Sequence, residues 1–251
     1  MRKLGLVGEK LGHSLSPHIH KNLMEKAAIE GDYDMIELPK YSFASQFQAL
    51  KSSDYCGVNI TIPYKEEVLP LLDGISPQAK YIGAVNTVVF KEGKAFGYNT
   101  DYDGFKALLE TNEIPVKGKE AIILGSGGAA KAAIKVLLDL GIFDITIVSR
   151  GKQNFHSHYT ISYEYFTETK QSCDILINCT PVGMYPNVKE SPIPKELINT
   201  KVVIDLIYNP KETQLLKFAK ALGCTAINGQ LMLEKQAEES QHIWTAAQCS
   251  L

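Results

Sequence analysis

The sequence lacks any paired cysteine motif. Only five of its 251 residues are cysteines, and no two of them form a C-x-x-C pair; they stand at Cys56, Cys173, Cys179, Cys224 and Cys249. An odd number of dispersed thiols argues against a disulfide framework and is typical of a protein kept in a reducing compartment. The six histidines are scattered as well, so we expect no metal site. We therefore expect a cytoplasmic protein.

The sequence also lacks an excess of charge of either sign and any long apolar run. Lys and Arg total 26 and Asp and Glu total 28, a net charge of −2, which provides no basic surface for nucleic acid or an anionic membrane. No apolar run approaches the ~18 residues that a membrane-spanning helix needs. The stretch before the first expected strand is too short for a secretory signal. We expect neither a nucleic-acid nor a membrane partner.

The most informative stretch is AIILGSGGAAKAA, residues 121–133. A short apolar strand runs into a glycine turn, and an alanine-rich helix follows over 131–140. Gly125 permits the tight turn, Gly127 lets the backbone approach a pyrophosphate, and a small residue such as Ala130 lets the helix pack close to the strand. The helix N-terminus supplies free N–H groups for the phosphates. This context predicts a dinucleotide site, and the alternative is an ordinary βαβ crossover with a glycine turn.

The next strand, DITIVSR, indicates which dinucleotide binds. An NAD site has an acid here, because a carboxylate binds the ribose 2′-OH. This strand ends instead at Ser149 and Arg150, and Lys152 follows two residues later. Two cations and a hydroxyl suit a 2′-phosphate, so the sequence predicts NADP.

The hydrophobic pattern divides the chain into two halves. Up to about residue 100, strand-like runs alternate with amphipathic segments, which predicts βαβ units and a largely parallel sheet. VNTVVF and KAFGYN predict a hairpin that closes this half, and Asp101 to Asn112 has helical spacing. In the second half the apolar strands AIIL, DITIV, DILINC, KVVIDLI and CTAIN alternate with helices, as in a doubly wound nucleotide-binding domain. A final amphipathic helix is expected over about Gly229 to Ala247.

Four polar clusters lie at expected strand ends of the first half, where α/β sheets place ligands. In HSLSP, Ser16 fits a helix N-cap and Pro17 the first helical position, so capping and ligand contact are equally good interpretations of Ser16. Capping is not available to Ser14, which favours an anion or hydroxyl contact there. The other clusters are NITIPYK, GAVNT and YNTD. Each alone is more often a cap, a turn or a solvated loop, and Lys65 alone would be a surface lysine.

Taken together, HSLSP, NITIPYK, GAVNT and NTD, followed by GSGGAAKA, NCTPVGM, DLIYNP and NGQLMLEKQ, closely resemble the ordered motif set of shikimate dehydrogenases. The resemblance covers essentially the whole chain. It implies an NADP-dependent oxidoreductase that reduces a small-molecule substrate, 3-dehydroshikimate, to shikimate in aromatic amino acid biosynthesis, as a monomer or homodimer. It also implies an N-terminal α/β substrate and catalytic domain over residues 1–101, to which a C-terminal helix of about 232–251 returns, and a Rossmann-like NADP domain over 102–231.

The resemblance further implies roles for individual residues. Lys65 is the catalytic lysine and Asp101 its acidic partner. Substrate binding is implied for Ser14 and Ser16 at the carboxylate, which Tyr208 also approaches, and for Thr61, Asn86, Asp101 and Gln236 at the ring hydroxyls, with Asn59 lining the same pocket. Cofactor binding is implied for Gly125, Ser126, Gly127, Gly128, Ala129, Ser149, Arg150, Thr180, Leu206 and Gly229. The family usually has Asn-Arg-Thr where this chain has Ser149-Arg150-Gly151, which alters one contact to the adenosine ribose.

Elementary chemistry agrees with these roles. Reducing a ring ketone needs a hydride at carbon and a proton at the developing alkoxide, which a lysine ammonium can stabilise and protonate. The nicotinamide carries the redox chemistry, so no metal is required. Two alternatives remain: a quinate/shikimate dehydrogenase of broader substrate and cofactor range, and a non-enzymatic regulator that keeps the binding site. Arg150 and the paired serines argue against the first, and Lys65 with Asp101 against the second.

Overall fold

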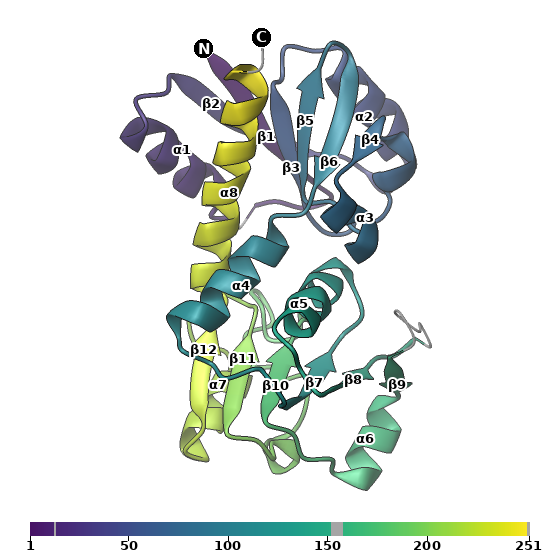
Figure 1. The fold of residues 1–251 in the computed structure, drawn as a ribbon, viewed down its shortest axis with the longest axis vertical. Helices are drawn as coiled ribbons and strands as arrows, with labels where there is room; N and C mark the ends of the chain where they lie inside the picture. The colour runs from purple at the N-terminus through teal and green to yellow at the C-terminus, as the bar shows by residue number, and fades with distance from the viewer. Residues whose placement is uncertain (13, 152–157, 250–251) are drawn as a thin grey trace. The chain divides into compact units, whose positions relative to one another are not determined.

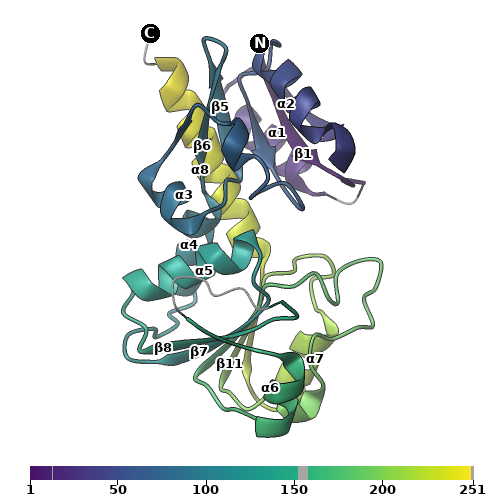
Figure 2. The same cartoon turned by 90° about the vertical axis from the view of Figure 1, so that its right-hand side faces the viewer.

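The fold is given by a computed structural model that describes residues 1–12, 14–151 and 158–249. The chain divides into two compact units: unit 1 comprises Met1–Gly104 and the chain from Glu234 onwards, and unit 2 comprises Phe105–Leu233. Each unit contains a six-stranded sheet with helices (Figures 1 and 2), so the predicted α/β fold is confirmed. None of the helices in the described ranges is long and apolar enough to cross a membrane.

The sheet of unit 1 is mixed, with the strand order β2-β1-β3-β5-β6-β4. Its strands are β1 (Arg2–Gly8), β2 (Gly31–Glu37), β3 (Gly57–Ile60), β4 (Gly74–Ile75), β5 (Thr87–Lys91) and β6 (Lys94–Tyr98). Both β2 and β3 pair with β1 in parallel, while β5 and β6 form the predicted antiparallel hairpin. Because β1 and β3 are parallel neighbours, the loops that follow them leave the same edge of the sheet.

Helices cover both faces of this sheet. They are α1 (Ser16–Lys26), α2 (Phe43–Lys51), α3 (Pro77–Ile82) and α8 (Gln230–Cys249). Neighbouring strand residues point to opposite faces, so Val88 packs in one cluster with Phe47 of α2, whereas Val89 packs in another with Met24 of α1 and Trp244 of α8. The Trp244 indole N–H donates to the Val88 carbonyl at 2.9 Å, which satisfies its buried donor. The last helix of the chain is therefore part of the N-terminal unit.

The sheet of unit 2 is entirely parallel, with the order β12-β11-β10-β7-β8-β9. Its strands are β7 (Glu120–Leu124), β8 (Asp144–Val148), β9 (Tyr159–Ile161), β10 (Ile175–Asn178), β11 (Val202–Asp205) and β12 (Thr225–Asn228), and its helices are α4 (Asp101–Thr111, shared with unit 1), α5 (Gly128–Asp139), α6 (Tyr163–Thr169) and α7 (Gln214–Ala221). The five predicted strands are confirmed. The sequence interpretation missed β9 and α6, which are too short to show a periodic apolar pattern.

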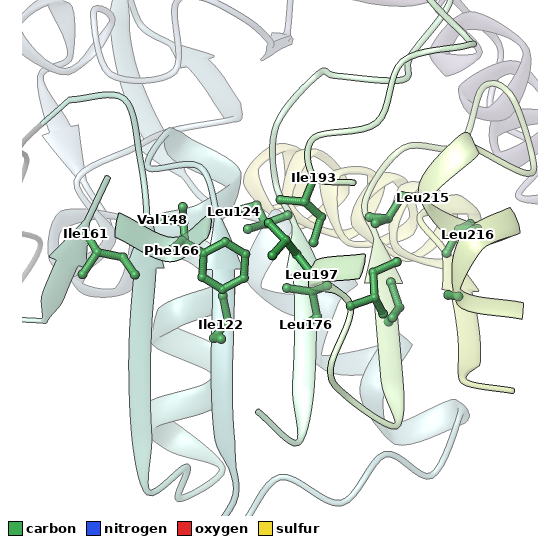
Figure 3. Close-up of a cluster of buried hydrophobic side chains, with 13 residues drawn as sticks. Ile122, Leu124, Val148, Ile161, Phe166, Leu176, Ile193, Leu197, Leu215 and Leu216 are labelled. Carbon is green, nitrogen blue, oxygen red and sulfur yellow. The ribbon is translucent and has the colours of Figure 1, made fainter. Parts of the chain in front are cut away.

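The core of unit 2 lies between its sheet and the helices α6 and α7 (Figure 3). Ile122 and Leu124 of β7 point into it and meet Phe166 of α6 and Leu215 of α7. Helix α5 lies on the opposite face of the sheet (Figures 1 and 2), with Ile134 fully buried. Burying an apolar side chain of this size contributes about 1.5–3 kcal/mol. Burial on both faces therefore fixes the register of the strands and aligns their carboxyl ends at one edge.

Candidate active site

A lysine and an aspartate meet in unit 1. Lys65 lies in the turn after β3, where its carbonyl accepts a hydrogen bond from the Val85 N–H at 2.8 Å. Asp101 is the first residue of α4. Lys65 Nζ donates to Asp101 Oδ2 at 2.5 Å, with only 17% and 7% of the two side chains exposed. Such a short, sheltered contact is a charge-assisted hydrogen bond, and it holds the ammonium in one place.

Asn86 fixes the second oxygen of Asp101. The Thr100 backbone N–H donates to Asn86 Oδ1 at 2.7 Å, and because that N–H can only donate, the amide nitrogen of Asn86 must face the other way. Asn86 Nδ2 donates to Asp101 Oδ1 at 3.0 Å and also lies 3.4 Å from Gln236 Oε1. Four of the predicted site residues, Lys65, Asp101, Asn86 and Gln236, thus form one hydrogen-bonded group.

Three buried hydroxyl groups form a cluster in contact with Asn86, and none of them was singled out in the sequence analysis. They belong to Thr87, Thr100 and Ser240, all fully buried. Ser240 Oγ lies 2.9 Å from Thr87 Oγ1 and 3.1 Å from Thr100 Oγ1. The two threonines fall inside the motifs GAVNT and YNTD. Ser240 follows Gln236 by four residues on a helix, so the rule that such residues share a face could have identified it.

Asn59 is tied into the same network by both ends of its amide. Its Oδ1 accepts a hydrogen bond from the Tyr33 hydroxyl at 2.7 Å. Its Nδ2 lies 3.0 Å from Thr87 Oγ1, 3.0 Å from Ser240 Oγ and 3.1 Å from the Asn86 carbonyl. Protein groups therefore engage this amide on both sides, and it holds β3 against the hairpin.

The remaining predicted substrate residues of unit 1 follow β1 and β3. Thr61 directly follows β3, and its N–H donates to the Val7 carbonyl at 2.9 Å, which ties the ends of the two strands together. Ser14 and Ser16 lie between β1 and the first turn of α1. Since Leu11 donates to Glu37 Oε1 at 2.7 Å, the loop after β1 is anchored to the end of β2. His13, in the same motif, lies outside the described residues.

The structure excludes capping by Ser16, one of the two interpretations of that residue, and shows a hydrogen bond between Ser14 and the helix end, where capping was not expected. Ser16 is the first residue of the helix, and the N-cap position is Leu15, whose carbonyl accepts the first helical hydrogen bond, from Ile19 N. Ser14 Oγ accepts a hydrogen bond from the Ser16 N–H at 3.2 Å. The physical reason is that a serine hydroxyl readily accepts from the backbone two residues later, so Ser14 satisfies a helix-end donor that Leu15 cannot.

The glycine turn of unit 2 has the geometry of a phosphate site. Gly125 ends β7 with φ at +104°, and a Cβ there would lie 3.0 Å from Thr180 Cγ2, so the position requires glycine. A Cβ on Gly127, the N-cap of α5, would meet nothing within 4 Å. No described side chain caps this helix, so its first N–H groups are open to an anion. The helix begins at Gly128, three residues earlier than predicted, because the turn is tighter than expected.

Ser149 and Arg150 directly follow β8, the strand next to β7. Ser149 Oγ lies 2.9 Å from Ser126 Oγ in the glycine turn and accepts from the Gly151 N–H at 3.3 Å. The hydroxyl thus joins the glycine turn to the turn that carries Arg150, whose side chain is exposed. A guanidinium beside a glycine turn is suited to a phosphate. Lys152, the second predicted cation, lies outside the described residues.

The other cofactor candidates follow β10, β11 and β12 at the same edge. Thr180 Oγ1 donates to Asn178 Oδ1 at 2.7 Å. A Cβ on Gly229 would lie 2.0 Å from the Leu206 carbonyl oxygen, so the turn after β12 packs directly on the backbone after β11. Gly128 and Ala129 form the first turn of α5. Tyr208, a predicted substrate residue, also belongs to unit 2, in the loop after β11.

A buried carboxyl group fixes the ends of β10 and β11. Asp205 accepts hydrogen bonds from Asn178 Nδ2 at 2.9 Å and from Thr213 Oγ1 at 2.6 Å. Burial raises the pKa of Asp205 to about 6, although these donors oppose the shift. Within the described ranges, no cluster of three or more His, Cys, Asp or Glu side chains is arranged to hold a metal ion.

Known proteins are similar to this chain in sequence and in fold. Residues 6–88 match the family model described as the shikimate dehydrogenase substrate binding domain. A shikimate dehydrogenase (NADP(+)) of Clostridium beijerinckii is 44% identical over 254 residues, covering 99% of this chain and 93% of the relative. The crystal structure of shikimate dehydrogenase 1 from Peptoclostridium difficile matches with a TM-score of 0.92 at 45% identity, over 98% of this chain and 92% of that one. A Thermus thermophilus structure, described as shikimate 5-dehydrogenase in complex with NADP(H) and shikimate, matches with a TM-score of 0.87 at 34% identity, over 98% and 94%.

Proposed function

The chain belongs to the shikimate dehydrogenase family, and we propose how its own residues divide the work of that enzyme. It is an NADP-dependent oxidoreductase that reduces 3-dehydroshikimate reversibly to shikimate in aromatic amino acid biosynthesis. Unit 1 binds the substrate and supplies the acid–base groups, and unit 2 binds NADP. The observation that carries this assignment is the 2.5 Å contact between Lys65 Nζ and Asp101 Oδ2.

Lys65 acts on the carbonyl oxygen of the substrate. NADPH supplies the hydride to the carbonyl carbon when it is bound. The ammonium of Lys65 stabilises the negative charge that develops on the oxygen and then donates a proton to it, which leaves a neutral amine for solvent to reprotonate. Asp101 orients the ammonium and accepts a hydrogen bond from the neighbouring ring hydroxyl. In the reverse reaction the neutral amine removes the hydroxyl proton as the hydride leaves.

The substrate is bound by polar groups around this pair. Ser14 and Ser16 hold its carboxylate. Thr61, Asn86 and Gln236 bind the ring hydroxyls together with Asp101. The hydrogen bonds that already orient Asn86 toward Asp101 support this division, because a pre-oriented amide binds a hydroxyl without losing side-chain entropy. Asn59 lines the pocket. Its Nδ2 donates a hydrogen bond to the backbone carbonyl of Asn86 and so holds Asn86 in place.

The residues at the carboxyl edge of the unit 2 sheet fit NADP. The first N–H groups of α5, over Gly128 and Ala129, would bind the pyrophosphate, and the open space at Gly127 leaves room for it. Arg150 binds the 2′-phosphate, and Ser149 with Ser126 holds the two turns together. Thr180, Leu206 and Gly229 line the rest of the cofactor site. No acid stands where an NAD site would have one, which favours NADP.

A comparison of two cofactors and two substrates tests this function. We expect the highest kcat/KM when NADPH is oxidised with 3-dehydroshikimate, and much lower values with NADH or with 3-dehydroquinate. Comparable values for all pairs would instead indicate a quinate/shikimate dehydrogenase of broader range. No turnover with any pair would indicate a regulator. We further propose a cytoplasmic location and a monomer or homodimer, which localisation by microscopy and light scattering in solution test in turn.

A further inference from the structure

The hydroxyl of Ser240 has more partners than its helix requires. A serine inside a helix commonly donates to the carbonyl four residues earlier, and Ser240 Oγ does so to Gln236 at 2.9 Å. Since that bond uses its only proton, every other partner can only donate to the Ser240 oxygen, which has two lone pairs and accepts from two of them at a time. Those partners are Asn59 Nδ2 at 3.0 Å, Thr87 Oγ1 at 2.9 Å and Thr100 Oγ1 at 3.1 Å. The side chain is fully buried, so no water competes for these positions.

The protons of this cluster can be placed in one consistent order. The Thr87 hydroxyl donates to Ser240 Oγ at 2.9 Å, and Asn86 Oδ1 accepts from the Thr100 backbone N–H at 2.7 Å. The Thr100 hydroxyl donates to Ser240 Oγ, and its oxygen accepts from Asn86 Nδ2 at 3.0 Å. The second N–H of Asn86 is then left for Asp101 Oδ1. In this arrangement, Ser240 is the acceptor that allows Thr100 to receive a hydrogen bond from Asn86.

We propose that Ser240 is a positioning residue for the Lys65–Asp101 pair and acts through Thr100 and Asn86. This inference rests on the catalytic roles proposed above for Lys65 and Asp101. Without the Ser240 oxygen, the Thr100 hydroxyl would turn to its other acceptors, Asn86 Oδ1 at 3.2 Å or Gln236 Oε1 at 3.4 Å. The first contact would shift Asn86, which orients Asp101, and the second would shift Gln236, which is proposed to bind the substrate. The C-terminal helix thereby affects the chemical step without touching the reacting atoms.

Ser240→Ala tests the proposal, with Thr245→Ala as its matched control. Thr245 lies on the same helix and makes the same bond to the carbonyl four residues earlier, at 2.8 Å, but it does not touch the network. We expect Ser240→Ala to lower kcat by about tenfold, the size of a lost buried hydrogen bond, with the KM for NADPH unchanged. Thr245→Ala should keep the wild-type kcat. Urea unfolding of both variants shows whether they are equally folded under assay conditions.

Combining Ser240→Ala with Asp101→Asn separates positioning from a purely structural effect. If Ser240 acts through Asp101, its removal should change the residual kcat of Asp101→Asn less than about twofold, because effects within one network are not additive. An equal loss in both backgrounds would overturn the inference while leaving the proposed function intact. A wild-type kcat for Asp101→Asn alone would instead overturn the proposed function.

A second substitution covers the case in which the alanine variant does not fold. Ser240→Cys keeps the shape of the side chain, with a larger sulfur atom in place of oxygen, and replaces the hydroxyl by a weak hydrogen-bonding group. The same cycle is then run with Ser240→Cys. A drop in kcat that disappears in the Asp101→Asn background supports the proposal. An unchanged kcat, or a drop of the same size in both backgrounds, contradicts it.

Discussion

Lys65 Nζ lies 2.5 Å from Asp101 Oδ2, although 36 residues separate the two in the sequence. The contact joins the turn after β3 to the first residue of α4, while Asn86, just before β5, holds the other oxygen of Asp101 at 3.0 Å. Three segments of unit 1 therefore build the pair, and the proposed NADP residues all belong to unit 2. Replacing a member of the pair should for this reason impair chemistry without impairing cofactor binding.

We expect Lys65→Ala to lower kcat by about 10²–10⁴, the usual contribution of a positioned acid–base group. The shikimate KM should change only a few-fold, because the ammonium interacts most strongly with the charge that develops in the transition state. Asp101→Asn should impair kcat and the shikimate KM together. Steady-state kinetics measure both, and fluorescence titration should show normal NADPH binding. Loss of activity purely through a higher KM would show that Lys65 binds the substrate and does not catalyse.

Arg150→Ala should change the choice of cofactor. An arginine bound to a phosphate makes a charge-assisted contact, often through two N–H groups. Its removal should raise the KM for NADPH by about tenfold to a hundredfold and should barely change the KM for NADH. Kinetics with both cofactors at saturating shikimate measure this difference. An equal rise for both cofactors would indicate that Arg150 supports the fold of the turn and does not bind the 2′-phosphate.

The parts of the fold that could be predicted are those whose apolar or glycine pattern extends over several residues. The apolar strands, the hairpin and the glycine turn were each visible in the sequence because burial on both faces or a tight turn restricts the residue types. Strand β4 has only two residues, β9 has three and α3 has six, so none of them is long enough for its apolar pattern to repeat twice. Their positions depend on pairing with strands remote in the sequence, such as β6 for β4.

The candidate site was predictable to a similar extent. Motif order identified Lys65, Asp101, Asn86 and Gln236, and the structure joins these four by hydrogen bonds. Ser240 was not identified: its spacing from Gln236 places it on the same helix face, but its hydrogen-bond partners Asn59, Thr87 and Thr100 are remote in the sequence. The roles of Ser14 and Ser16 depended on where the helix begins, and helix boundaries are poorly defined by sequence.

The two serines of HSLSP should affect substrate affinity alone. Ser14→Ala with Ser16→Ala removes two hydroxyl groups, each worth about 0.5–1.5 kcal/mol if it binds the substrate carboxylate. Calorimetry should show weaker shikimate binding and unchanged NADPH binding. Because Ser14 Oγ also accepts from the Ser16 N–H, circular dichroism must first show that the double variant keeps its helix content. Unaltered shikimate affinity would rule out the proposed contact.

Gly127 and Gly229 form a matched pair of glycine substitutions. A Cβ at 229 would lie 2.0 Å from the Leu206 carbonyl oxygen, and one at 127 would meet nothing within 4 Å. Gly229→Ala should therefore lower the free energy of unfolding by about 1–3 kcal/mol, as overpacking does. Gly127→Ala should cost at most about 1 kcal/mol at an N-cap but raise the KM for NADPH, because its methyl group occupies the space proposed for the pyrophosphate. An unchanged KM in Gly127→Ala would place the phosphate elsewhere.

His20 provides a pH-dependent test of the core of unit 1. The side chain is fully buried on α1 and stacks on Tyr33 with ring centroids 4.3 Å apart and an interplanar angle of 7°. Its Nδ1 lies 3.0 Å from Gln241 Nε2, which can only donate, so Nδ1 is an acceptor and the native ring is neutral. Burial lowers the pKa of His20 to about 3, against 6.5 for an unperturbed histidine.

The contribution of His20 to the stability of the protein should therefore fall as the pH drops below 6.5. In that range the unfolded chain binds a proton on His20 that the native state excludes until the pH approaches 3. The free energy of unfolding then decreases by up to about 1.4 kcal/mol per pH unit.

The variant His20→Phe tests this expectation, because it keeps a stacked ring but cannot titrate. Urea unfolding at pH 7.0 and 5.5 should show a loss about 1 kcal/mol larger in the wild type than in His20→Phe. Asp205, whose raised pKa acts in the opposite sense, is common to both proteins and cancels in this comparison. His18→Gln, at an exposed position of the same helix, should keep the wild-type difference. Equal losses in wild type and His20→Phe would show that His20 can accept a proton in the native state.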